Sequence, residues 1–592
     1  MAAKKTSRLR SREWFDIPGD PSTTALHIER YTNFGISSEE LRSGKPIIGI
    51  AQTGSDLVPC NRIHMNLALR VREGIREAGG IALEFPVHPI QESGKRPTAA
   101  LDRNLQYLGL VEVLFGYPID GVVLTIGCDK TTPALLMAAS TVDIPSICLS
   151  SGPMMNGYWK GERAGSGTIV WKARKLLATG EIDEEEFIKI VVDATTSPGF
   201  CNTMGTATTM NSLAEGLGMS LPGCAAIPAP LSERIEMSYR TGLRIVEMVK
   251  KDLTPSKILT RKAFENSIVL NSAIGGSTNA PIHINAIARH VGVELEIEDW
   301  EKVGLEIPML VNMQPGGKYL GEDFHRAGGV PAVMNALLKA GKLHDSAITV
   351  NGKTVAENYA ETTTQDTDVI RTFQNPMLEN AGFIVLKGNI FDSAVMKTSV
   401  ISDSFRSQYL DKPGSKNVFE VRAIVFEGPE DYRKRINDPQ LNINVDCILV
   451  IRGCGPVGYP GSAEVVNMQP PDKLIREGIL ELPTLGDGRQ SGTSGSPSIL
   501  NASPESAVGG GLALLKTGDM LRIDLNQGSL DVMLDKSELQ KRHDELKTEE
   551  IENQTPWQEI YRNTVGQLSS GGIIELAAKY RKIRNTIPRH SH

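Results

Sequence analysis

Short apolar runs separated by amphipathic stretches dominate the first two thirds of the chain. The runs IIGIAQT, IALEFPV, GVVLTIG and SICLSSG occupy residues 47–53, 81–87, 121–127 and 146–152. Runs of this length that are apolar almost throughout are typical of strands buried on both faces, as in parallel sheets covered by helices. The pattern therefore predicts an α/β fold in this part of the chain.

The stretches between these runs have helical periodicity. After the first run, apolar residues recur every three or four positions, at Leu67, Val71, Ile75 and Ala78. This spacing puts them on one face of a helix, which the two glycines at 79 and 80 would end. Residues 98–116 are predicted to form the next helix. Strands that alternate with helices indicate crossover connections, so we expect the strands to be parallel.

The pattern changes near residue 380. From there, strand-like runs dominate, at residues 381–390, 417–428, 444–453 and 520–535, and the last one contains a hairpin turn signal at Asn526–Gly528. A chain of 592 residues is also too long for a single core. We therefore predict two domains. Residues 1–380 would form an α/β domain with a parallel sheet covered by helices, and residues 381–592 a β-rich, barrel-like domain.

Composition and charge exclude several classes of protein. The chain is 40% hydrophobic and 22% charged, as soluble globular proteins are. A net charge of −7, without a basic stripe interleaved with aromatic residues, argues against a nucleic-acid binder. No apolar run approaches the roughly 18 residues of a membrane helix. The opening MAAKKTSRLRSREWF is basic like a transit peptide, but it lacks a sustained amphipathic pattern, and we interpret it as a surface arm or oligomer contact.

The cysteines do not form a disulfide framework, because the seven of them are scattered and odd in number. The cytoplasm is therefore the expected compartment. A lone buried cysteine is usually a small core residue, and this is the expectation for Cys148, Cys224, Cys447 and Cys454.

Reactive side chains follow three of the predicted strands, at the point where each strand ends. They are Asp56 and Cys60, then His88 and Glu92, then Cys128, Asp129 and Lys130. Ligands of open α/β sheets bind at the carboxyl ends of the strands. Because parallel strands share one carboxyl edge, we expect these loops to meet at one rim.

A fourth contribution is expected from Cys201, which precedes a helix indicated by Met210, Leu213 and Leu217. A helix amino end favours the thiolate, which is the metal-binding form. Two familiar sites are excluded. No CxxC occurs, which argues against a zinc finger, and a phosphate loop would need glycine immediately before Lys130.

Each of these residues also has an ordinary interpretation. A single cysteine can fill the core, Asp129 and Lys130 could form a local ion pair, and Glu92 could be a solvated loop charge. Taken together, three thiols and hard oxygen ligands remain. Thiolates suit an iron–sulfur cluster and carboxylates suit Mg²⁺. Three thiols leave one cluster position unfilled, as a cluster that binds substrate as a Lewis acid requires.

Six motifs resemble the dihydroxyacid and sugar-acid dehydratases. They are PCN at Cys60, GCDKTTP at Cys128, CNTMGTATTMN at Cys201, GGSTNAPIH at 275–283, GYPGSAEV with Glu464, and DGRQSGT with Ser491. The match to the family runs in order from about residue 45 to beyond residue 515, and no motif residue departs from the family pattern. AQTGSDLVPCNRIH, FPVHPIQE and the ending PRHSH look most like the xylonate branch, beside other aldonate dehydratases. The branched-chain dihydroxyacid and phosphogluconate dehydratases look more distant.

The resemblance implies a hydro-lyase that converts a 2,3-dihydroxy acid to a 2-keto-3-deoxy acid. D-xylonate is the expected substrate, with L-arabinonate, D-gluconate or D-galactonate, and more remotely a branched dihydroxyacid, as alternatives. Cys60, Cys128 and Cys201 would hold a [2Fe-2S] cluster, with [4Fe-4S] as the alternative, and its open iron would take the C3 hydroxyl. Glu92, Asp129 and Glu464 match the Mg²⁺ ligands.

Lys130 matches a lysine that is carbamylated and binds the metal through the carbamate; the alternative is an unmodified salt bridge. The metal would then stabilise the charge formed when the substrate loses its C2 proton. Ser491 matches the family's base, and Thr493 is expected to contact the substrate or the base. By composition alone, DGRQSGTSGSP is a flexible loop. The resemblance also implies an active site between the domains and a homodimer or homotetramer.

On the residues alone, two other classes stay open. One is a Mg²⁺-dependent hydrolase or phosphotransferase that uses Asp129 and Glu92 and has structural cysteines. The other is a non-catalytic sugar-acid-binding protein.

Overall fold

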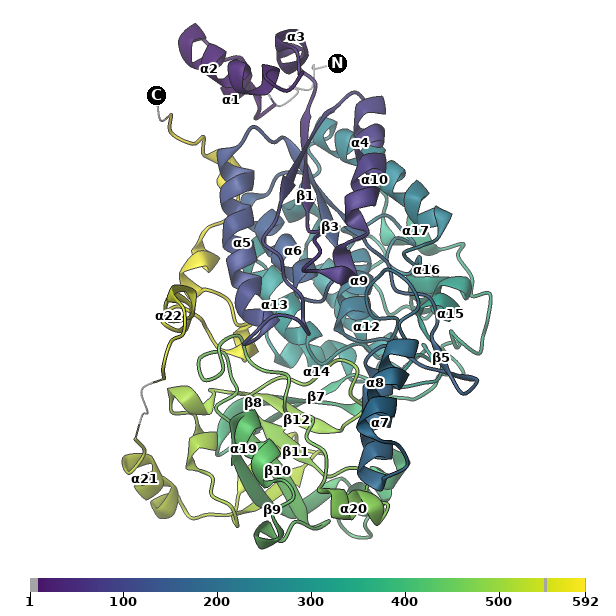
Figure 1. The fold of residues 1–592 in the computed structure, drawn as a ribbon, viewed down its shortest axis with the longest axis vertical. Coiled ribbons are helices and arrows are strands. Elements are labelled where there is room, and N and C mark those ends of the chain that lie inside the picture. The colour runs from purple at the N-terminus through teal and green to yellow at the C-terminus, as the bar shows by residue number, and fades with distance from the viewer. Residues whose placement is uncertain (1–8, 548–550, 591–592) are drawn as a thin grey trace.

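A four-stranded parallel sheet forms the centre of the amino-terminal part (Figure 1). In the computed structural model, which describes residues 9–547 and 551–590, its strands lie in the order β2–β1–β3–β4. They are β1 (Ile47–Gln52), β2 (Ile81–Pro86), β3 (Gly121–Ile126) and β4 (Ser146–Ser150). The predicted strands and their parallel pairing are confirmed. β1, β3 and β4 are buried throughout, whereas the edge strand β2 is partly exposed.

Helices cover both faces of this sheet. α4 (His64–Glu77) and α10 (Ser232–Lys250) lie on one face, and α5 (Ala99–Gly116) and α6 (Thr131–Val142) lie on the other (Figure 1). The first pair approaches closely because glycines meet at the crossing. A Cβ on Gly74 would lie 2.2 Å from the Tyr239 carbonyl oxygen, and one on Gly242 would lie 2.2 Å from that of Val71.

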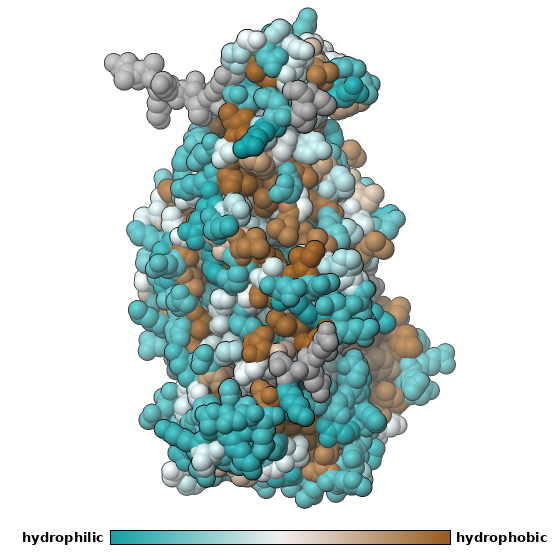
Figure 2. Space-filling view, turned by 90° about the vertical axis from the view of Figure 1, so that its left-hand side faces the viewer, coloured by the Kyte–Doolittle hydropathy of each residue, from teal (hydrophilic) through white to brown (hydrophobic). Residues whose placement is uncertain are grey.

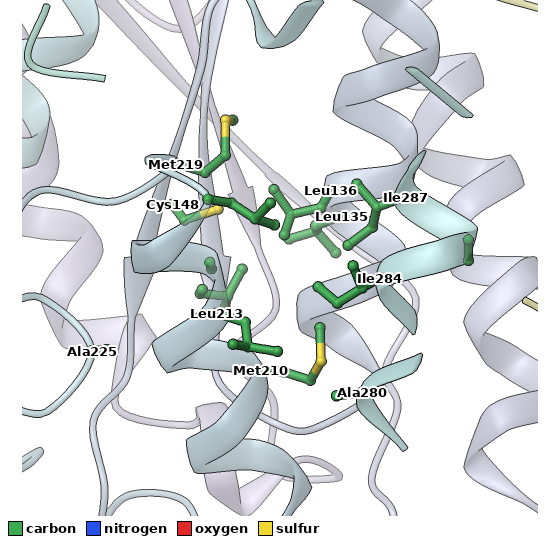
Figure 3. Packing of buried hydrophobic residues seen from close by; sticks show 14 of the residues in the cluster. Leu135, Leu136, Cys148, Met210, Leu213, Met219, Ala225, Ala280, Ile284 and Ile287 are labelled. Carbon is green, nitrogen blue, oxygen red and sulfur yellow. The ribbon is translucent and has the colours of Figure 1, made fainter. Parts of the chain in front are cut away.

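A dense apolar core lies beneath the carboxyl edge of the sheet (Figure 3). It joins α6 to α9 (Thr206–Gly216) and α13 (Ala280–Val291), with Leu135, Met210 and Ile284 completely buried between them. Cys148 lies in the same core, and Cys224, Cys447 and Cys454 are also buried, so the core interpretation of these four cysteines is confirmed. All seven cysteines are free thiols in the described part of the chain.

The remaining helices of this part flank the core. They are α7 (Thr168–Thr179), α8 (Glu184–Asp193), α11 (Pro255–Ile258), α12 (Arg261–Ala273), α14 (Glu298–Gly304), α15 (Gly321–Arg326), α16 (Gly329–Lys339) and α17 (Val355–Tyr359). Three helices, α1 (Arg12–Phe15), α2 (Pro21–Thr32) and α3 (Ser38–Arg42), precede β1. A short hairpin, β5 (Tyr158–Trp159) with β6 (Glu162–Arg163), precedes α7.

A closed eight-stranded barrel forms the second part, which confirms the β-rich prediction. Its order is β10–β11–β12–β8–β7–β14–β13–β9. The strands are β7 (Phe383–Gly388), β8 (Phe391–Lys397), β9 (Val418–Glu427), β10 (Cys447–Arg452), β11 (Thr484–Gly486), β12 (Ser498–Ser503), β13 (Met520–Asp524) and β14 (Ser529–Val532). Asp524 pairs with Ser529, so the hairpin turn signal is confirmed.

The carboxyl-terminal segment leaves the barrel and returns to the α/β part. After α21 (Lys536–Asp544) and α22 (Pro556–Arg562), it runs along α5 (Figure 1). The Arg103 guanidinium donates to the carbonyl oxygens of Gly571 and Gly572 at 2.7 and 2.6 Å. The boundary at residue 380 falls between α17 and β7 and stays a proposal.

Part of the basic amino-terminal arm, residues 1–8, and the last two residues of the ending PRHSH lie outside the described residues. At the start of the described chain, Arg10 donates to the carbonyl oxygens of Leu114 and Tyr117, both at 3.0 Å, beside the carboxyl end of α5. Among the helices of the described residues, none is long and apolar enough to cross a membrane.

Candidate active site

One cavity of about 590 Å³ brings together eight of the nine predicted site residues. It lies where loops from the carboxyl edge of the sheet meet loops from the barrel. Its walls include Cys60, Glu92, Cys128, Asp129, Cys201, Glu464, Ser491 and Thr493. The ninth residue, Lys130, is completely buried and forms ion pairs with the carboxylates of this wall.

The three predicted cluster thiols come from three loops. Cys60 lies in the turn Pro59–Asn61 after β1, Cys128 follows β3, and Cys201 lies in the loop before α9. The side chain of Asn61 joins the first two loops, because its Oδ1 accepts a hydrogen bond of 2.7 Å from the Cys128 backbone N–H. Polar neighbours also reach the sulfurs: the Ser166 hydroxyl lies 3.3 Å from Cys201 Sγ.

The thiols are close enough to change each other's pKa. A hydrogen bond between Cys128 and Cys60 lowers the pKa of Cys60, and this bond together with burial raises the pKa of Cys128. Burial, with the neighbouring Cys60, raises the pKa of Cys201 to about 12. The predicted helix after Cys201 is confirmed as α9, but it begins only at Thr206, and burial outweighs any effect of the helix end on the pKa of this thiol. Three thiols that converge on one wall of the cavity fit a metal cluster by the chemistry of the donor set.

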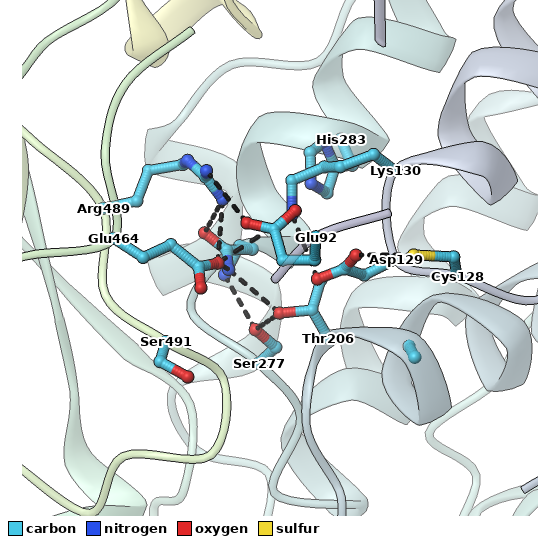
Figure 4. Close-up of polar contacts among 12 residues, drawn as sticks. Glu92, Cys128, Asp129, Lys130, Thr206, Ser277, His283, Glu464, Arg489 and Ser491 are labelled. Carbon is cyan, nitrogen blue, oxygen red and sulfur yellow. Dashed lines mark hydrogen bonds and ion pairs between the residues drawn. The ribbon is translucent and has the colours of Figure 1, made fainter. Parts of the chain in front are cut away.

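Three carboxylates converge beside the thiols (Figure 4). Glu92 comes from the loop after β2, Asp129 from the turn after β3, and Glu464 from the loop between β10 and β11. One oxygen of each lies within 4.8 Å of the others. Hard carboxylate oxygens in this arrangement are the ligands that Mg²⁺ prefers.

Two buried cations face these carboxylates from opposite sides (Figure 4). Lys130 Nζ lies 2.9 Å from Glu92 Oε2 and 3.1 Å from Asp129 Oδ2. Arg489 lies 2.9 Å from Glu464 Oε1 and 3.4 Å from Glu92 Oε1. Unmodified Lys130 thus forms salt bridges with Glu92 and Asp129, as expected if this lysine is not carbamylated.

The pKa values of the cluster show how strongly these charges are coupled. Burial, with the neighbouring Glu92, raises the pKa of Glu464 to about 7, and the same two causes raise the pKa of Asp129. Burial would also raise the pKa of Glu92, but Lys130 and Arg489 outweigh it and lower this pKa. Burial would lower the pKa of Lys130, but Asp129 and Glu92 outweigh it and raise this pKa. Three carboxylates facing two cations leave an excess negative charge that a divalent cation would offset.

Ser491 and Thr493 lie on a barrel loop that is packed against the α/β part. Their hydroxyl oxygens are 3.0 Å apart. Gly492 between them has no room for a side chain, since a Cβ would lie 2.6 Å from Thr206 N and 2.8 Å from Ser277 Oγ. The loop that looked flexible by composition is therefore held between α9 and the segment before α13.

Two further residues of this site had no role in the sequence interpretation. Asn279 Nδ2 donates to Glu464 Oε1 at 2.7 Å, and its other partners include Thr206 Oγ1 at 2.9 Å and the Gln490 carbonyl oxygen at 3.2 Å. Arg489 is the second. Both lie inside motifs noticed in the sequence, GGSTNAPIH and DGRQSGT, but their partners are distant in the chain.

Two residues expected at the rim lie elsewhere. Asp56 is exposed and forms an ion pair of 2.7 Å with Arg62. His88 Nε2 lies 2.9 Å from Asp102 Oδ2. Neither residue lines the cavity.

Comparison with known proteins identifies the family. The family model described as dihydroxy-acid/6-phosphogluconate dehydratase N-terminal matches residues 45–358, and the C-terminal model of the same family matches residues 368–572. The chain belongs to this family. The recognition from motifs and the prediction of a hydro-lyase are thereby confirmed, and the family uses an iron–sulfur cluster and Mg²⁺.

Known proteins of this family align with almost the whole length of this chain. The chain is 61% identical to a D-xylonate dehydratase of Caulobacter vibrioides over 592 residues, which is 100% of this chain and 99% of that protein. It is 45% identical to an L-arabinonate dehydratase of Rhizobium leguminosarum bv. trifolii, over 90% of each chain. A dihydroxy-acid dehydratase of Caldanaerobacter subterraneus subsp. tengcongensis is 37% identical, over 91% of this chain and 95% of its own.

Proposed function

We propose that this dehydratase converts D-xylonate to its 2-keto-3-deoxy acid and water in the cavity between the sheet edge and the barrel. The observation that carries the proposal is the convergence of three thiols, three carboxylates and Ser491 on one cavity. The substrate rests on the full-length similarity to a D-xylonate dehydratase at 61% identity. L-arabinonate is the next candidate, because L-arabinonate dehydratases are also relatives.

In this proposal Cys60, Cys128 and Cys201 hold a [2Fe-2S] cluster, and Glu92, Asp129 and Glu464 hold Mg²⁺. When bound, the two centres supply Lewis acidity at the C3 hydroxyl and at the substrate's carboxylate and C2 oxygen. Lys130 completes the metal ligands after carbamylation. Its ammonium nitrogen forms a bond to CO₂ and releases two protons in all, so the cation between Glu92 and Asp129 becomes an anionic oxygen ligand.

The proton transfer falls to Ser491. Its Oγ, in the deprotonated form, takes the C2 proton, the electron pair of that C–H bond forms the C2–C3 double bond, and hydroxide leaves C3 and takes up a proton to become the water released. The resulting enol gains a proton at C3 and loses the proton of its C2 hydroxyl, which gives the 2-keto-3-deoxy acid. Thr493, with its hydroxyl 3.0 Å from Ser491 Oγ, is placed to donate to the base. Asn279 and Arg489 hold Glu464 at the metal side of the same cavity.

We also propose a homodimer or homotetramer in the cytoplasm. Apolar side chains gather on the face that carries α5 and the carboxyl-terminal segment (Figure 2). Large apolar residues of these segments are exposed, among them Ile560, Leu576 and Tyr580. Burial of such a face between copies removes apolar surface from water. The free thiols fit a reducing compartment.

The test is a substrate panel with protein purified without oxygen. D-xylonate, L-arabinonate, D-gluconate, D-galactonate, 6-phosphogluconate and a branched dihydroxyacid are supplied in turn, and the 2-keto acid product is measured. The highest kcat/KM is expected for D-xylonate. A higher value for 6-phosphogluconate or the branched acid would contradict the proposal. Colourless protein without sulfide-to-iron absorption would instead favour a Mg²⁺-dependent hydrolase or a binding protein.

A further inference from the structure

A line of hydrogen bonds runs from the cavity to the first turn of α7. Ser491 Oγ lies 3.0 Å from Thr493 Oγ1, and Thr493 Oγ1 lies 3.0 Å from the indole Nε1 of Trp171. Trp171 belongs to the α/β part and Thr493 to the barrel, so the line crosses the junction between them.

The side chain of Thr493 is closely packed against two glycines, so it has little room to change its conformation. A Cβ on Gly167 would lie 2.6 Å from Thr493 Cγ2 and 2.8 Å from its Oγ1, and a Cβ on Gly205 would lie 3.1 Å from the same methyl group. Gly167, at φ +82°, caps α7, and Gly205 precedes α9. Two glycines thus form a cradle for this threonine, which fixes where its hydroxyl oxygen lies.

The chemistry of tryptophan sets the direction of the hydrogen bonds. An indole N–H can donate but cannot accept. Thr493 Oγ1 must therefore accept from Trp171, and its own hydrogen stays available for Ser491 Oγ. A serine that has lost its proton can only accept, so the Thr493 hydroxyl is the donor in the state that removes the C2 proton. A hydrogen bond to an ionised acceptor is stronger than one between two neutral groups, so this bond would stabilise the deprotonated serine.

Trp171 itself lies outside the reaction cavity. It lines a second cavity of about 580 Å³, together with Thr168, Lys172 and Thr493. The Arg174 guanidinium lies 4.7 Å from the centre of the Trp171 ring. Thr493 lines both cavities, whereas Trp171 does not line the cavity of Cys60 and Glu464.

We propose that Trp171 is a positioning residue for dehydration, whose N–H turns the Thr493 hydroxyl toward Ser491. This inference rests on the proposed function, in which Ser491 is the base. Trp171 acts through Thr493, so its loss should slow proton removal while leaving substrate binding and both metal centres in place.

The experiment compares Trp171→Phe, Thr493→Val and the double variant, with Trp159→Phe as a matched control outside both cavities. Trp171→Phe keeps an aromatic ring but loses the donor. We expect kcat to fall about tenfold, the KM for D-xylonate to change less than twofold, and C2 hydrogen exchange with deuterated solvent to slow in parallel. Iron content and visible spectrum should match the parent enzyme. In the Thr493→Val background, the same substitution should have less than a twofold effect.

Several results would overturn the inference. A Trp171→Phe kcat within twofold of the parent would do so, as would effects of Trp171→Phe and Thr493→Val that simply multiply. If Trp171→Phe lowers the melting temperature, Trp171→His separates folding from donation, because it keeps a ring N–H. Its kcat should exceed that of Trp171→Phe, and an equal or lower kcat would also overturn the inference.

Ser491→Ala distinguishes this inference from the proposed function. Normal turnover in Ser491→Ala would remove Ser491 as the base. Loss of turnover in Ser491→Ala, combined with normal turnover in Trp171→Phe, would remove only the role of Trp171.

Discussion

Replacement of Asn279 by alanine should weaken Mg²⁺ binding without affecting the iron–sulfur cluster. Asn279 is completely buried, and its amide donates to Glu464 Oε1 at 2.7 Å. The same amide contacts Thr206 Oγ1 and the carbonyl oxygen of Gln490, the residue before the proposed base. The substitution therefore releases a proposed metal ligand and loosens the loop that carries Ser491.

The magnitude follows from the charged hydrogen bond. A hydrogen bond to an ionised group contributes about 1.5–3 kcal/mol. At about 1.4 kcal/mol for each factor of ten, its loss corresponds to roughly a 10- to 100-fold weaker Mg²⁺ affinity. This is also the range, about 10–100-fold, observed when the hydrogen-bonding partners of metal ligands are removed elsewhere. Saturating Mg²⁺ should restore part of the turnover, because the ligand itself remains.

The assay is the rate of 2-keto acid formation as a function of Mg²⁺ after removal of divalent ions with a chelator. Iron content and the visible spectrum report the cluster independently. Asn285→Ala is the matched control: Asn285 is also buried, lies on α13, and accepts a hydrogen bond of 2.9 Å from Trp300 Nε1. Asn285→Ala should lower the stability of the fold but leave the Mg²⁺ concentration that gives half-maximal turnover unchanged. If the Mg²⁺ concentration for half-maximal turnover of Asn279→Ala lies within twofold of the parent value, this reasoning is refuted.

Three further predictions concern single residues. Ser491→Ala should lower turnover by about two to four orders of magnitude and abolish C2 exchange with deuterated solvent, while iron and Mg²⁺ contents stay normal; near-normal turnover would place the base elsewhere. Lys130→Arg keeps the charge but cannot form the carbamate, so turnover should fall by at least about 100-fold with iron retained, and bicarbonate should not restore it. Burial lowers the pKa of Lys397 to about 7, and its Nζ donates to the Gly275 carbonyl oxygen at 2.8 Å. Between that value and the ordinary 10.5 the unfolded chain binds more protons, so raising the pH from 7.5 to 9 should stabilise the parent relative to Lys397→Met in thermal melts; a constant difference would contradict this shift.

The parallel sheet was predictable because β1, β3 and β4 are buried on both faces. Such strands are apolar at most positions, and the sequence shows this directly. Barrel strands gave weaker signals. β12 (SILNAS) contains polar residues that are nevertheless buried, and β11 has only three residues, so local patterns did not reveal either strand. Closure of the barrel depends on pairings between distant segments, which periodicity does not record.

The same limit applies to the site. Cys60, Cys128 and Glu92 follow predicted strands, so the shared carboxyl edge of a parallel sheet brought them together in the prediction. Glu464 and Ser491 came only from the resemblance, because no local rule says which barrel loop faces the sheet. Asn279 and Arg489 were missed since their partners are far along the chain. For Cys201, we expected the amino end of the following helix to favour the thiolate, but burial raises the pKa of this thiol instead.

The iron content of cysteine variants tests the central claim most directly, namely that Cys60, Cys128 and Cys201 together hold the cluster used in dehydration. Each is replaced by serine, and iron per chain is measured after purification without oxygen, beside Cys148→Ser as the control from the core under the site. We predict that all three variants lose iron and turnover together, because serine replaces a soft ligand by a poor one, while Cys148→Ser keeps both. Full iron and full turnover in any of the three variants would contradict the account.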